Sequence, residues 1–301
     1  VCNKRECQLK LGLVQDDNLF SNSVCEAAQS YAKQQGIAMV LSGKVTTINA
    51  TTTLKTVLRN YQDAGANIIF GCTYSTSGHL IIKALEEIDF SPFAVILTET
   101  VSAPDYAELI RSGWWQGEYV LGPSSWHHNR QGRGSFSNWT SKEFNDKYRS
   151  ISNSPASYIG AAQFAAGCVL ARAIEAAGAL ETHAVAREVQ QTQLQEFFGN
   201  VSFDGSGQNQ MDMLLLQFGS VHDEAEIVHP PNTRTAFMTY PMPSWSQRRC
   251  SLFGPGMVAE VAQLRRAPHP RDPECRGYGK CTSHGLCECE VGYSGVDCGA
   301  N

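Results

Sequence analysis

Cysteines are the residues of this chain whose spacing most clearly indicates a chemistry. The chain has 301 residues and 11 cysteines, and five of these lie close together, at Cys275, Cys281, Cys287, Cys289 and Cys298. A segment this short and rich in glycine cannot bury enough apolar surface to fold alone, so we expect disulfide bonds to stabilise it. Zinc is the alternative for Cys-x-Cys, but no further His or Cys stands at finger or ribbon spacing. The pattern therefore favours disulfides in an oxidising compartment and predicts no metal site.

Polar and aromatic side chains on four predicted loops could bind a small molecule. Each loop follows a strand pattern, and the loops span 15–22, 42–47, 71–78 and 98–105. Their candidate residues are Asp16, Asp17, Phe20, Cys72, Thr73, Tyr74, Ser75 and Glu99. A carboxylate, an aromatic pair and several hydroxyls suit a small ligand that is cationic or zwitterionic. A nucleotide is disfavoured, because the chain has no Gly-x-Gly-x-x-Gly after a strand and no P-loop.

Each candidate also has a purely structural explanation. Glu99 is either a ligand-binding carboxylate or a solvated loop residue. Phe20 and Tyr74 either line a site or cover the edge of the sheet. Asp16 and Asp17 are residues that typically form turns. The sequence alone leaves these alternatives open.

Nothing in the chain indicates catalysis. There is no nucleophile-elbow Gly-x-Ser-x-Gly and no recognisable pair of nucleophile and base. His127 and His128 are adjacent, and neighbouring side chains rarely reach one metal ion, so we assign them no metal or catalytic role. For Cys72, a disulfide or a buried thiol is favoured over a reactive thiol. We therefore expect a protein that is not an enzyme and uses no cofactor.

The elements that must position these loops alternate between two periods. Apolar runs predict strands at 9–14, 37–41, 67–70, 93–97 and 118–121. Between them, apolar residues at helical spacing predict helices around 24–32, 54–61 and 80–88. Uninterrupted apolar strands separated by amphipathic helices are typical of a parallel sheet covered on both faces. Ligands of such α/β sheets bind at the carboxyl ends of the strands, where the four loops lie.

The second half of the chain has a different character. We expect helices at 139–150, 155–177 and 182–197, then strands at 200–203 and 211–217 joined by a turn at 204–207. The middle helix carries an apolar stripe, and we expect this stripe to be exposed if no sheet covers it: Phe164, Val169, Leu170 and Ile174. Residues 246–274 read as a polar, proline-containing linker with a short helix near 257–264.

This succession resembles the type I periplasmic-binding-protein fold, which bacterial branched-chain amino-acid binders share with ectodomains of natriuretic-peptide and metabotropic glutamate receptors. The segments that carry the resemblance are 11–20, 61–74, 158–164, 173–180 and 198–207. It implies a partial two-lobed domain over 8–245. The second lobe would comprise about 8–124 and 200–220, and helices of the first lobe about 125–199. The strands of the N-terminal lobe have no counterpart in the chain.

The same resemblance implies roles for three candidates. Phe20 and Tyr74 match aromatic residues that line the cleft of the family. Glu99 matches an acidic residue that takes the ammonium group of an amino-acid ligand. The expected partner is therefore a small amino-acid-like molecule. The sequence leaves the oligomeric state open, with a homodimer as one option.

Residues 275–299 resemble an epidermal-growth-factor-like module of the tenascin type, through Cys-x-Cys, the eight-residue gap and the Gly-Tyr-x-Gly turn. The resemblance implies the pairs Cys275–Cys287 and Cys289–Cys298. Cys281 then needs a partner, and Cys250 is the nearest candidate upstream.

Composition and sequons complete the expected setting. The formal net charge of −5 argues against nucleic acid as a partner, and no run of about 18 apolar residues predicts a membrane span. Sequons for N-glycosylation stand at Asn49, Asn138 and Asn200. No signal peptide opens the chain, so we expect a processed chain or a fragment. We predict the extracellular ligand-sensing region of a cell-surface membrane receptor; the alternative is a structural or adhesive extracellular protein without a small ligand.

Overall fold

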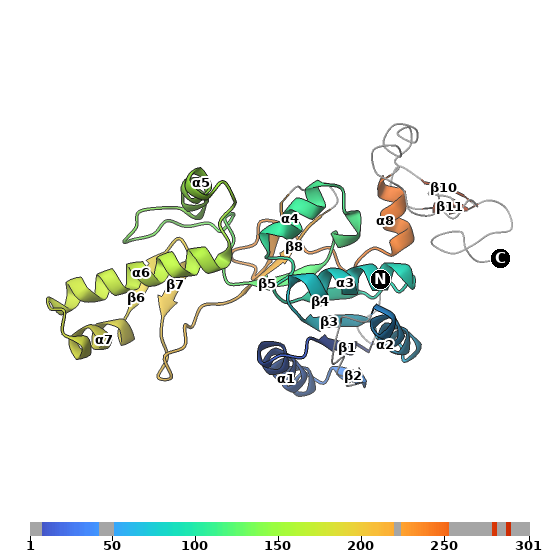
Figure 1. Ribbon diagram of the computed structural model, residues 1–301, viewed down its shortest axis with the longest axis horizontal. Coiled ribbons are helices and arrows are strands. Elements are labelled where there is room, and N and C mark those ends of the chain that lie inside the picture. The colour runs from blue at the N-terminus through green and yellow to red at the C-terminus, as the bar shows by residue number, and fades with distance from the viewer. Residues whose placement is uncertain (1–7, 42–50, 220–223, 253–278, 282–286, 290–301) are drawn as a thin grey trace.

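The computed structural model describes residues 8–41, 51–219, 224–252, 279–281 and 287–289. Figure 1 shows a large sheet flanked by helices, and a second, elongated part built mainly of helices. We call the first the sheet lobe (8–41, 51–124, 214–219 and 224–252) and the second the helical lobe (125–213). The chain passes between the lobes after β5 and returns before β8.

The sheet lobe contains a seven-stranded sheet in the order β2-β1-β3-β4-β5-β8-β9. The first five strands in this order pair in parallel, and β8 pairs antiparallel with β5 on one side and with β9 on the other. The strands are β1 (Lys10–Gln15), β2 (Ala38–Leu41), β3 (Ile68–Cys72), β4 (Ala94–Leu97), β5 (Leu121–Ser124), β8 (Leu214–Gln217) and β9 (Glu226–His229). The predicted parallel α/β sheet is therefore confirmed.

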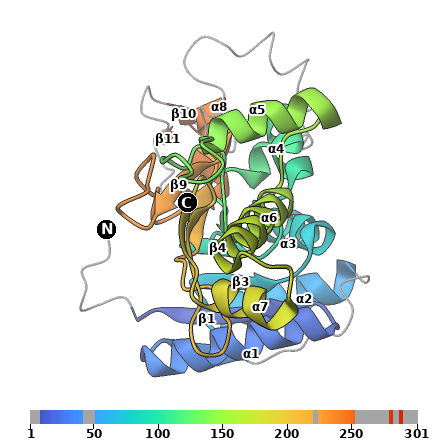
Figure 2. The same cartoon turned by 90° about the vertical axis from the view of Figure 1, so that its left-hand side faces the viewer.

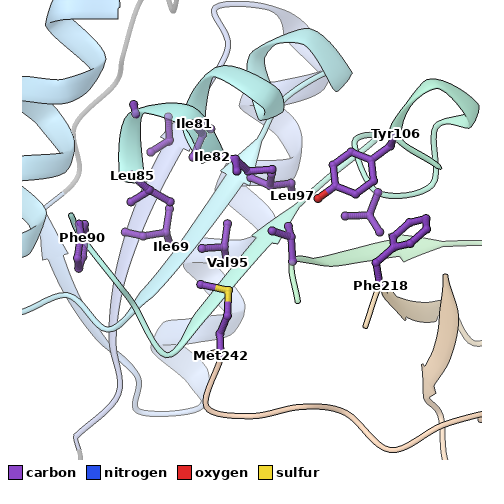
Figure 3. Packing of buried hydrophobic residues seen from close by; sticks show 14 of the residues in the cluster. Ile69, Ile81, Ile82, Leu85, Phe90, Val95, Leu97, Tyr106, Phe218 and Met242 are labelled. Carbon is purple, nitrogen blue, oxygen red and sulfur yellow. The ribbon is translucent and has the colours of Figure 1, made fainter. Parts of the chain in front are cut away.

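Helices cover both faces of this sheet. They are α1 (Leu19–Gln34), α2 (Thr51–Asp63), α3 (Ser75–Glu87), α4 (Pro104–Arg111), the 3-10 turn η1 (Trp115–Gly117) and α8 (Trp245–Leu252). On one face the apolar sides of α2 and α3 pack on the strands around Ile69 and Val95. Figure 3 shows this packing for Ile81, Ile82 and Leu85 of α3. On the other face α1 packs on Leu11 and Leu13 through Cys25. The apolar sides of the strands and of the helices thus form two buried layers, one on each face of the sheet.

Two predicted elements of the sheet lobe differ in the structure. The strand expected at 118–121 begins only at Leu121, because Tyr119 has a positive φ of 65° that interrupts extended backbone. The strand expected at 211–217 is shorter and begins at Leu214. Helices α4 and α8 and strand β9 were not expected from the sequence.

The helical lobe consists of α5 (Ser141–Ser152), α6 (Tyr158–Ala177), α7 (Thr182–Gln190), β6 (Gln193–Glu196) and β7 (Gly199–Ser202). Its core forms where the small Ala161 and Ala165 of α6 meet the rings of Phe144 and Phe197. Figures 1 and 2 show α6 extending away from the sheet lobe, with α7 near its far end.

The strand pairing of the helical lobe corrects the sequence prediction. The helix expected over 182–197 ends at Gln190, and β6 follows with Leu194 and Glu196 facing inward. β7 then pairs with β6 rather than with the next strand along the chain. β8, which was expected to form a hairpin with β7, instead lies between β5 and β9 in the large sheet.

By length and composition, α6 is the one helix of the described residues that is apolar enough to cross a membrane. It carries Arg172 and Glu175, which are exposed and near one another. Its alanine face is buried within the helical lobe. The core helix of a globular protein meets the same criteria, so composition assigns α6 no membrane span.

Near the C-terminal end, β10 (Gly279–Cys281) and β11 (Cys287–Cys289) form a short antiparallel pair. The backbone of Cys281 lies opposite that of Cys287. The side chains of the predicted disulfide set lie outside the described residues, as do the linker helix near 257–264 and the sequon at Asn49. The pairings Cys275–Cys287, Cys289–Cys298 and Cys250–Cys281 therefore stay predictions.

Candidate ligand-binding site

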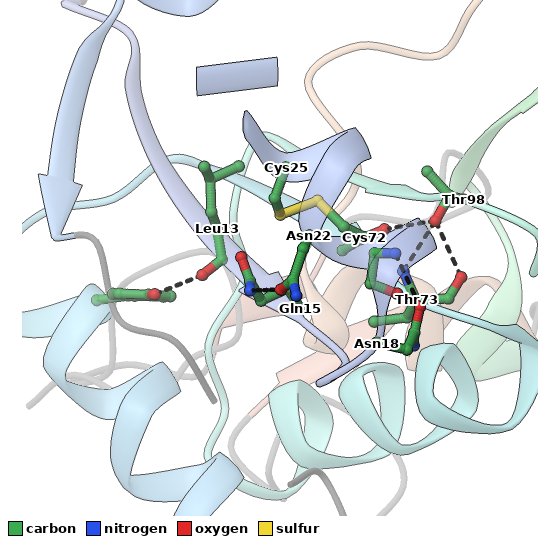
Figure 4. The surroundings of a disulfide bond; sticks show 11 residues. Leu13, Gln15, Asn18, Asn22, Cys25, Cys72, Thr73 and Thr98 are labelled. Carbon is green, nitrogen blue, oxygen red and sulfur yellow. Dashed lines mark hydrogen bonds between the residues drawn. A yellow bond between two sulfur atoms is a disulfide. The ribbon is translucent and has the colours of Figure 1, made fainter. Parts of the chain in front are cut away.

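A disulfide anchors the part of the site that lies on β3 and α1. Cys25 of α1 is bonded to Cys72 at the carboxyl end of β3, 47 residues further along the chain (Figure 4). Both residues are buried, at 3% and 0% exposure. This settles the alternative left open for Cys72: it is neither a reactive nor a free thiol. The bond joins the second turn of α1 to the last residue of β3.

Phe20 and Tyr74 stand on these two joined segments. Their rings stack with centroids 5.4 Å apart and an interplanar angle of 27°. Both remain accessible, with exposures of 37% and 50%. Asp16 supports the arrangement, since its Oδ2 accepts a hydrogen bond from the Tyr74 backbone N–H at 3.0 Å. Asp17 is exposed. Two aromatic rings thus form an open apolar surface at the edge of the sheet.

The loop that carries Glu99 is tied to the same edge. Thr98 is buried, and its hydroxyl accepts from the Thr73 backbone N–H at 2.8 Å (Figure 4). Glu99 itself has a positive φ of 55°, a backbone conformation that non-glycine residues seldom adopt outside turns and functional sites. A Cβ on Gly78 would lie 2.0 Å from the Thr100 hydroxyl, so a glycine is required where α3 meets this loop.

Glu99 contacts the helical lobe through Tyr158. The Tyr158 hydroxyl donates to the Glu99 carboxylate, at 2.6 Å from each oxygen. Burial raises the pKa of Tyr158, and the neighbouring Glu99 carboxylate raises it further, so the phenol keeps its proton and remains a donor. Tyr158 opens α6, whose first turn is capped by the Ser157 hydroxyl accepting from the Gly160 N–H.

Sequence reasoning missed Tyr158 as a site residue. The sequence placed Tyr158 near the start of a predicted helix. That position does not predict which loop of the sheet lobe the side chain contacts. The structure brings Phe20 and Tyr74 together as a stacked pair and joins Glu99 to Tyr158. The nearby Tyr74 also contributes, as the smallest of the causes, to the raised pKa of Tyr158.

Three histidines and Cys168 lie outside the group formed by Phe20, Tyr74 and Glu99, and each contacts neighbouring side chains or is buried. His127 and His128 lie with ring centroids 4.2 Å apart, and His128 Nε2 is 2.8 Å from Glu224 Oε2. His79 packs between the rings of Tyr106 and Trp114. Cys168 is a buried free thiol. Within the described ranges, no group of three or more His, Cys, Asp or Glu could hold a metal ion.

Comparison with known proteins agrees with this architecture. The profile of the periplasmic binding protein family matches residues 4–223, and that of the EGF-like domain matches residues 268–298. No curated protein sequence is significantly similar to the chain.

Solved structures of similar fold include the leucine-binding protein LivK of Thermotoga maritima, with a TM-score of 0.60 and 16% identity over 74% of this chain and 61% of that one. A substrate-binding protein of Desulfitobacterium hafniense in complex with Leu has a TM-score of 0.56 and 19% identity, over 73% and 60%. LivJ of Streptococcus pneumoniae in complex with isoleucine has a TM-score of 0.55 and 13% identity, over 73% and 60%.

The chain thus spans about three fifths of the length of these proteins, and at such identities the likeness shows the fold. The family profile, in contrast, covers well over half of the chain. The chain therefore belongs to the periplasmic binding protein family, and it carries an EGF-like domain after the periplasmic-binding-protein region.

Proposed function

We propose that the chain is the extracellular ligand-sensing region of a cell-surface receptor and that it binds a small amino-acid-like molecule. One observation carries the proposal: an acidic side chain held in a left-handed backbone conformation, Glu99, stands at the same sheet edge as the exposed, stacked pair Phe20 and Tyr74. Solved proteins of the same fold have leucine or isoleucine bound.

The chemistry of the three side chains suits an α-amino acid. Glu99 accepts hydrogen bonds from the ligand's ammonium group, a charge-assisted contact that is about twice as strong as a neutral one. The rings of Phe20 and Tyr74 supply an apolar wall for an aliphatic side chain, and their faces also favour a nearby cation. Tyr158 already donates to Glu99 and so occupies one of the positions that an ammonium group would take.

An extracellular setting supports the receptor role. The buried Cys25–Cys72 bond and the EGF-like domain are features of proteins that fold in oxidising compartments. The sequon residues Asn138 and Asn200 are exposed, as an acceptor of N-linked glycan must be. We propose in addition that the receptor is anchored in the membrane and signals through an effector.

The decisive test is Glu99→Gln, which keeps the shape of the side chain and removes its charge. Calorimetry with L-leucine should show a loss of affinity of roughly ten- to a hundredfold, because a hydrogen bond to a charged group contributes about 1.5–3 kcal/mol. The variant should change little with 4-methylpentanoate, the deaminated analogue. Glu108→Gln, in exposed α4 sequence, is the matched control and should bind like the wild type.

Two results would contradict the proposal. An equal loss for leucine and its deaminated analogue would mean that Glu99 acts through folding rather than through the ammonium group. An absence of any saturable binding of amino acids to the wild-type chain would favour the structural or adhesive alternative.

A further inference from the structure

Two N-glycosylation sequons lie in the helical lobe. Asn138-Trp-Thr140 lies in the turn before α5, and Asn200-Val-Ser202 lies in β7. Both asparagines are exposed, and neither side-chain amide has a hydrogen-bond partner among the described residues. Each amide nitrogen is therefore open to solvent and has room for a bulky substituent.

The alternation of side chains along β7 directs Asn200 outward. Gly199 and Val201 are buried, and Asn200 is exposed between them. Val201 packs in one apolar cluster with Cys168 and Val169 of α6, and Figure 1 shows β6 and β7 beside this helix. Because successive side chains of a strand point to opposite faces, Asn200 lies on the face of the strand pair that is turned away from α6.

Asn138 is held in a tight turn. Its φ of 59° lies in the left-handed region, which asparagine adopts more readily than most residues. The Gly134 N–H donates to the Trp139 carbonyl at 2.8 Å, and the Asn138 N–H donates to the Gly134 carbonyl at 3.1 Å. Trp139 packs against the core of the helical lobe, where its ring stacks on Phe164 with centroids 5.3 Å apart. The turn is thus anchored through Trp139, while Asn138 stays exposed.

A buried carboxylate joins this turn to the strand pair. Glu196 of β6 is 3% exposed, and it accepts hydrogen bonds from the backbone N–H groups of Phe136 and Ser137, each at 2.9 Å. It also accepts from the Ser137 hydroxyl at 2.6 Å. These bonds satisfy the buried charge and hold the turn with Asn138 against the strands that carry Asn200. We call the outward side of 133–140 and 193–202 the hairpin face.

We propose that Asn138 and Asn200 both carry N-linked glycans and that the hairpin face consequently stays exposed to solvent in the assembled receptor. The inference rests on the extracellular setting proposed above and is independent of the amino-acid ligand. N-linked glycans are bulky and hydrophilic, so a surface that carries two of them is not buried against another protein. Protein partners therefore contact other surfaces of the chain.

The modification is a transfer of an activated sugar. The asparagine Nδ2 attacks C1 of an oligosaccharide that is carried on a polyprenyl diphosphate, and an N–C1 bond forms. The bond from C1 to the diphosphate oxygen breaks, the polyprenyl diphosphate leaves with the electron pair, and the amide gives up one proton. Thr140 and Ser202 supply the hydroxyl of each sequon. In the folded chain the Thr140 hydroxyl caps α5 by accepting from the Glu143 N–H, so attachment fits the chain before α5 forms.

The test uses the full chain behind a cleavable signal peptide in cultured mammalian cells. Protein that has entered the secretory pathway, secreted or retained, is treated with peptide N-glycosidase in heavy-oxygen water, which converts each glycosylated asparagine to labelled aspartate. Peptide mapping should find the label at both Asn138 and Asn200 in most molecules. Asn138→Gln and Asn200→Gln should each remove the mass of one glycan, whereas Asn60→Gln, exposed on α2 outside any sequon, should remove none.

A matched pair of variants separates the sequon from its asparagine. Ser202→Ala keeps Asn200 but breaks the sequon, and it should abolish the glycan there, while Ser202→Thr should retain it. The glycosidase should also remove both glycans from natively folded protein without denaturant, because the hairpin face is open. Removal should leave the affinity for L-leucine unchanged.

Two results would overturn the proposal. One is recovery of Asn138 or Asn200 mainly unmodified from protein that has entered the secretory pathway. The other is glycans that the enzyme removes only after denaturation, since they would then be covered by a protein contact. A chain that carries both glycans but does not bind L-leucine would support this inference and contradict the amino-acid ligand, so the two proposals fail separately.

Discussion

The Tyr158 hydroxyl donates to the Glu99 carboxylate at 2.6 Å, and this contact joins the first turn of α6 to the loop after β4. The two residues are 59 positions apart in the sequence and belong to different lobes. The proposed ligand-binding carboxylate is thus already occupied by a donor of the protein itself, so an incoming ammonium group must compete with the phenol.

Tyr158→Phe tests this competition. Without the phenol hydroxyl, Glu99 is available to the ligand, and the affinity for L-leucine should rise by up to about tenfold, since the contact to be displaced involves a charged acceptor. Tyr148→Phe, on α5, is a matched control because no hydrogen bond of its hydroxyl is described. Calorimetry is the measurement. A fall in affinity in Tyr158→Phe would mean that the hydroxyl assists binding instead.

The Cys25–Cys72 bond should be a major source of stability for the sheet lobe. Replacing both residues by alanine opens a loop of 47 residues, and we expect the free energy of unfolding in urea to fall by about 2–4 kcal/mol. The stacking of Phe20 on Tyr74 should loosen with it, because the bond fixes the segments that carry them. Cys168→Ala, a buried free thiol of the helical lobe, should cost less.

Peptide mapping checks the bond directly. Digestion without reductant should recover Cys25 linked to Cys72. Recovery of either residue as a free thiol in natively folded protein would contradict the structure.

His127 should make the protein less stable in acid. Its pKa is about 3 in the folded protein and about 6.5 when unfolded, so between these values only the unfolded chain takes up the proton. The stability contributed by neutral His127 is therefore complete above pH 6.5 and is lost as the pH falls towards 3, by at most about 1.4 kcal/mol per pH unit.

The measurement is the free energy of unfolding as a function of pH. Its slope between pH 6.5 and 4 should become shallower in His127→Gln, while His183→Gln, at an exposed position of α7, should keep the slope of the wild type. An unchanged slope in His127→Gln would show that the ring takes up its proton in the folded protein as well.

The open groove between α6 and α7 should bind hydrophobic dyes. Leu170 and Leu180 are 50% and 83% exposed, and the groove is lined almost wholly by aliphatic side chains: Leu170, Ile174, Leu180, Val185, Ala186 and Val189. Of the stripe expected from the sequence, Val169 is instead buried against Leu194 and Val201 of the β6–β7 pair.

A change from leucine to glutamine at position 170 should reduce the dye fluorescence markedly and leave the melting temperature nearly unchanged. The same change at Leu19, which is 89% exposed on α1, is the control and should leave dye binding as it was. Equal dye binding by the Leu170 variant and the wild type would exclude the groove as the binding surface.

Local patterns in the chain were sufficient to predict the parallel strands of the sheet lobe and the edge of the sheet at which the candidate residues lie. The apolar residues are consecutive at 9–14, 67–70 and 93–97, whereas between these runs they recur at helical spacing. Such spacing can be read from a short stretch of sequence, because it reflects which side of a single element is buried. The carboxyl ends of parallel strands share one edge of a sheet, so Tyr74 and Glu99 could be assigned to that edge before any contact was known.

Contacts between distant segments could not be read from those patterns. Some of these contacts had several equivalent candidates in the sequence: Cys72 could have paired with any of the other 10 of the 11 cysteines, and β7 pairs with β6 rather than with β8. Others, such as the position of β8 in the large sheet and the hydrogen bond from Tyr158 to Glu99, join residues that are far apart in the sequence. Periodicity reports which side of an element is buried, whereas pairing depends on the packing of whole elements in three dimensions. The packing of the two lobes brings the Tyr158 hydroxyl of the helical lobe within hydrogen-bond distance of the Glu99 carboxylate of the sheet lobe.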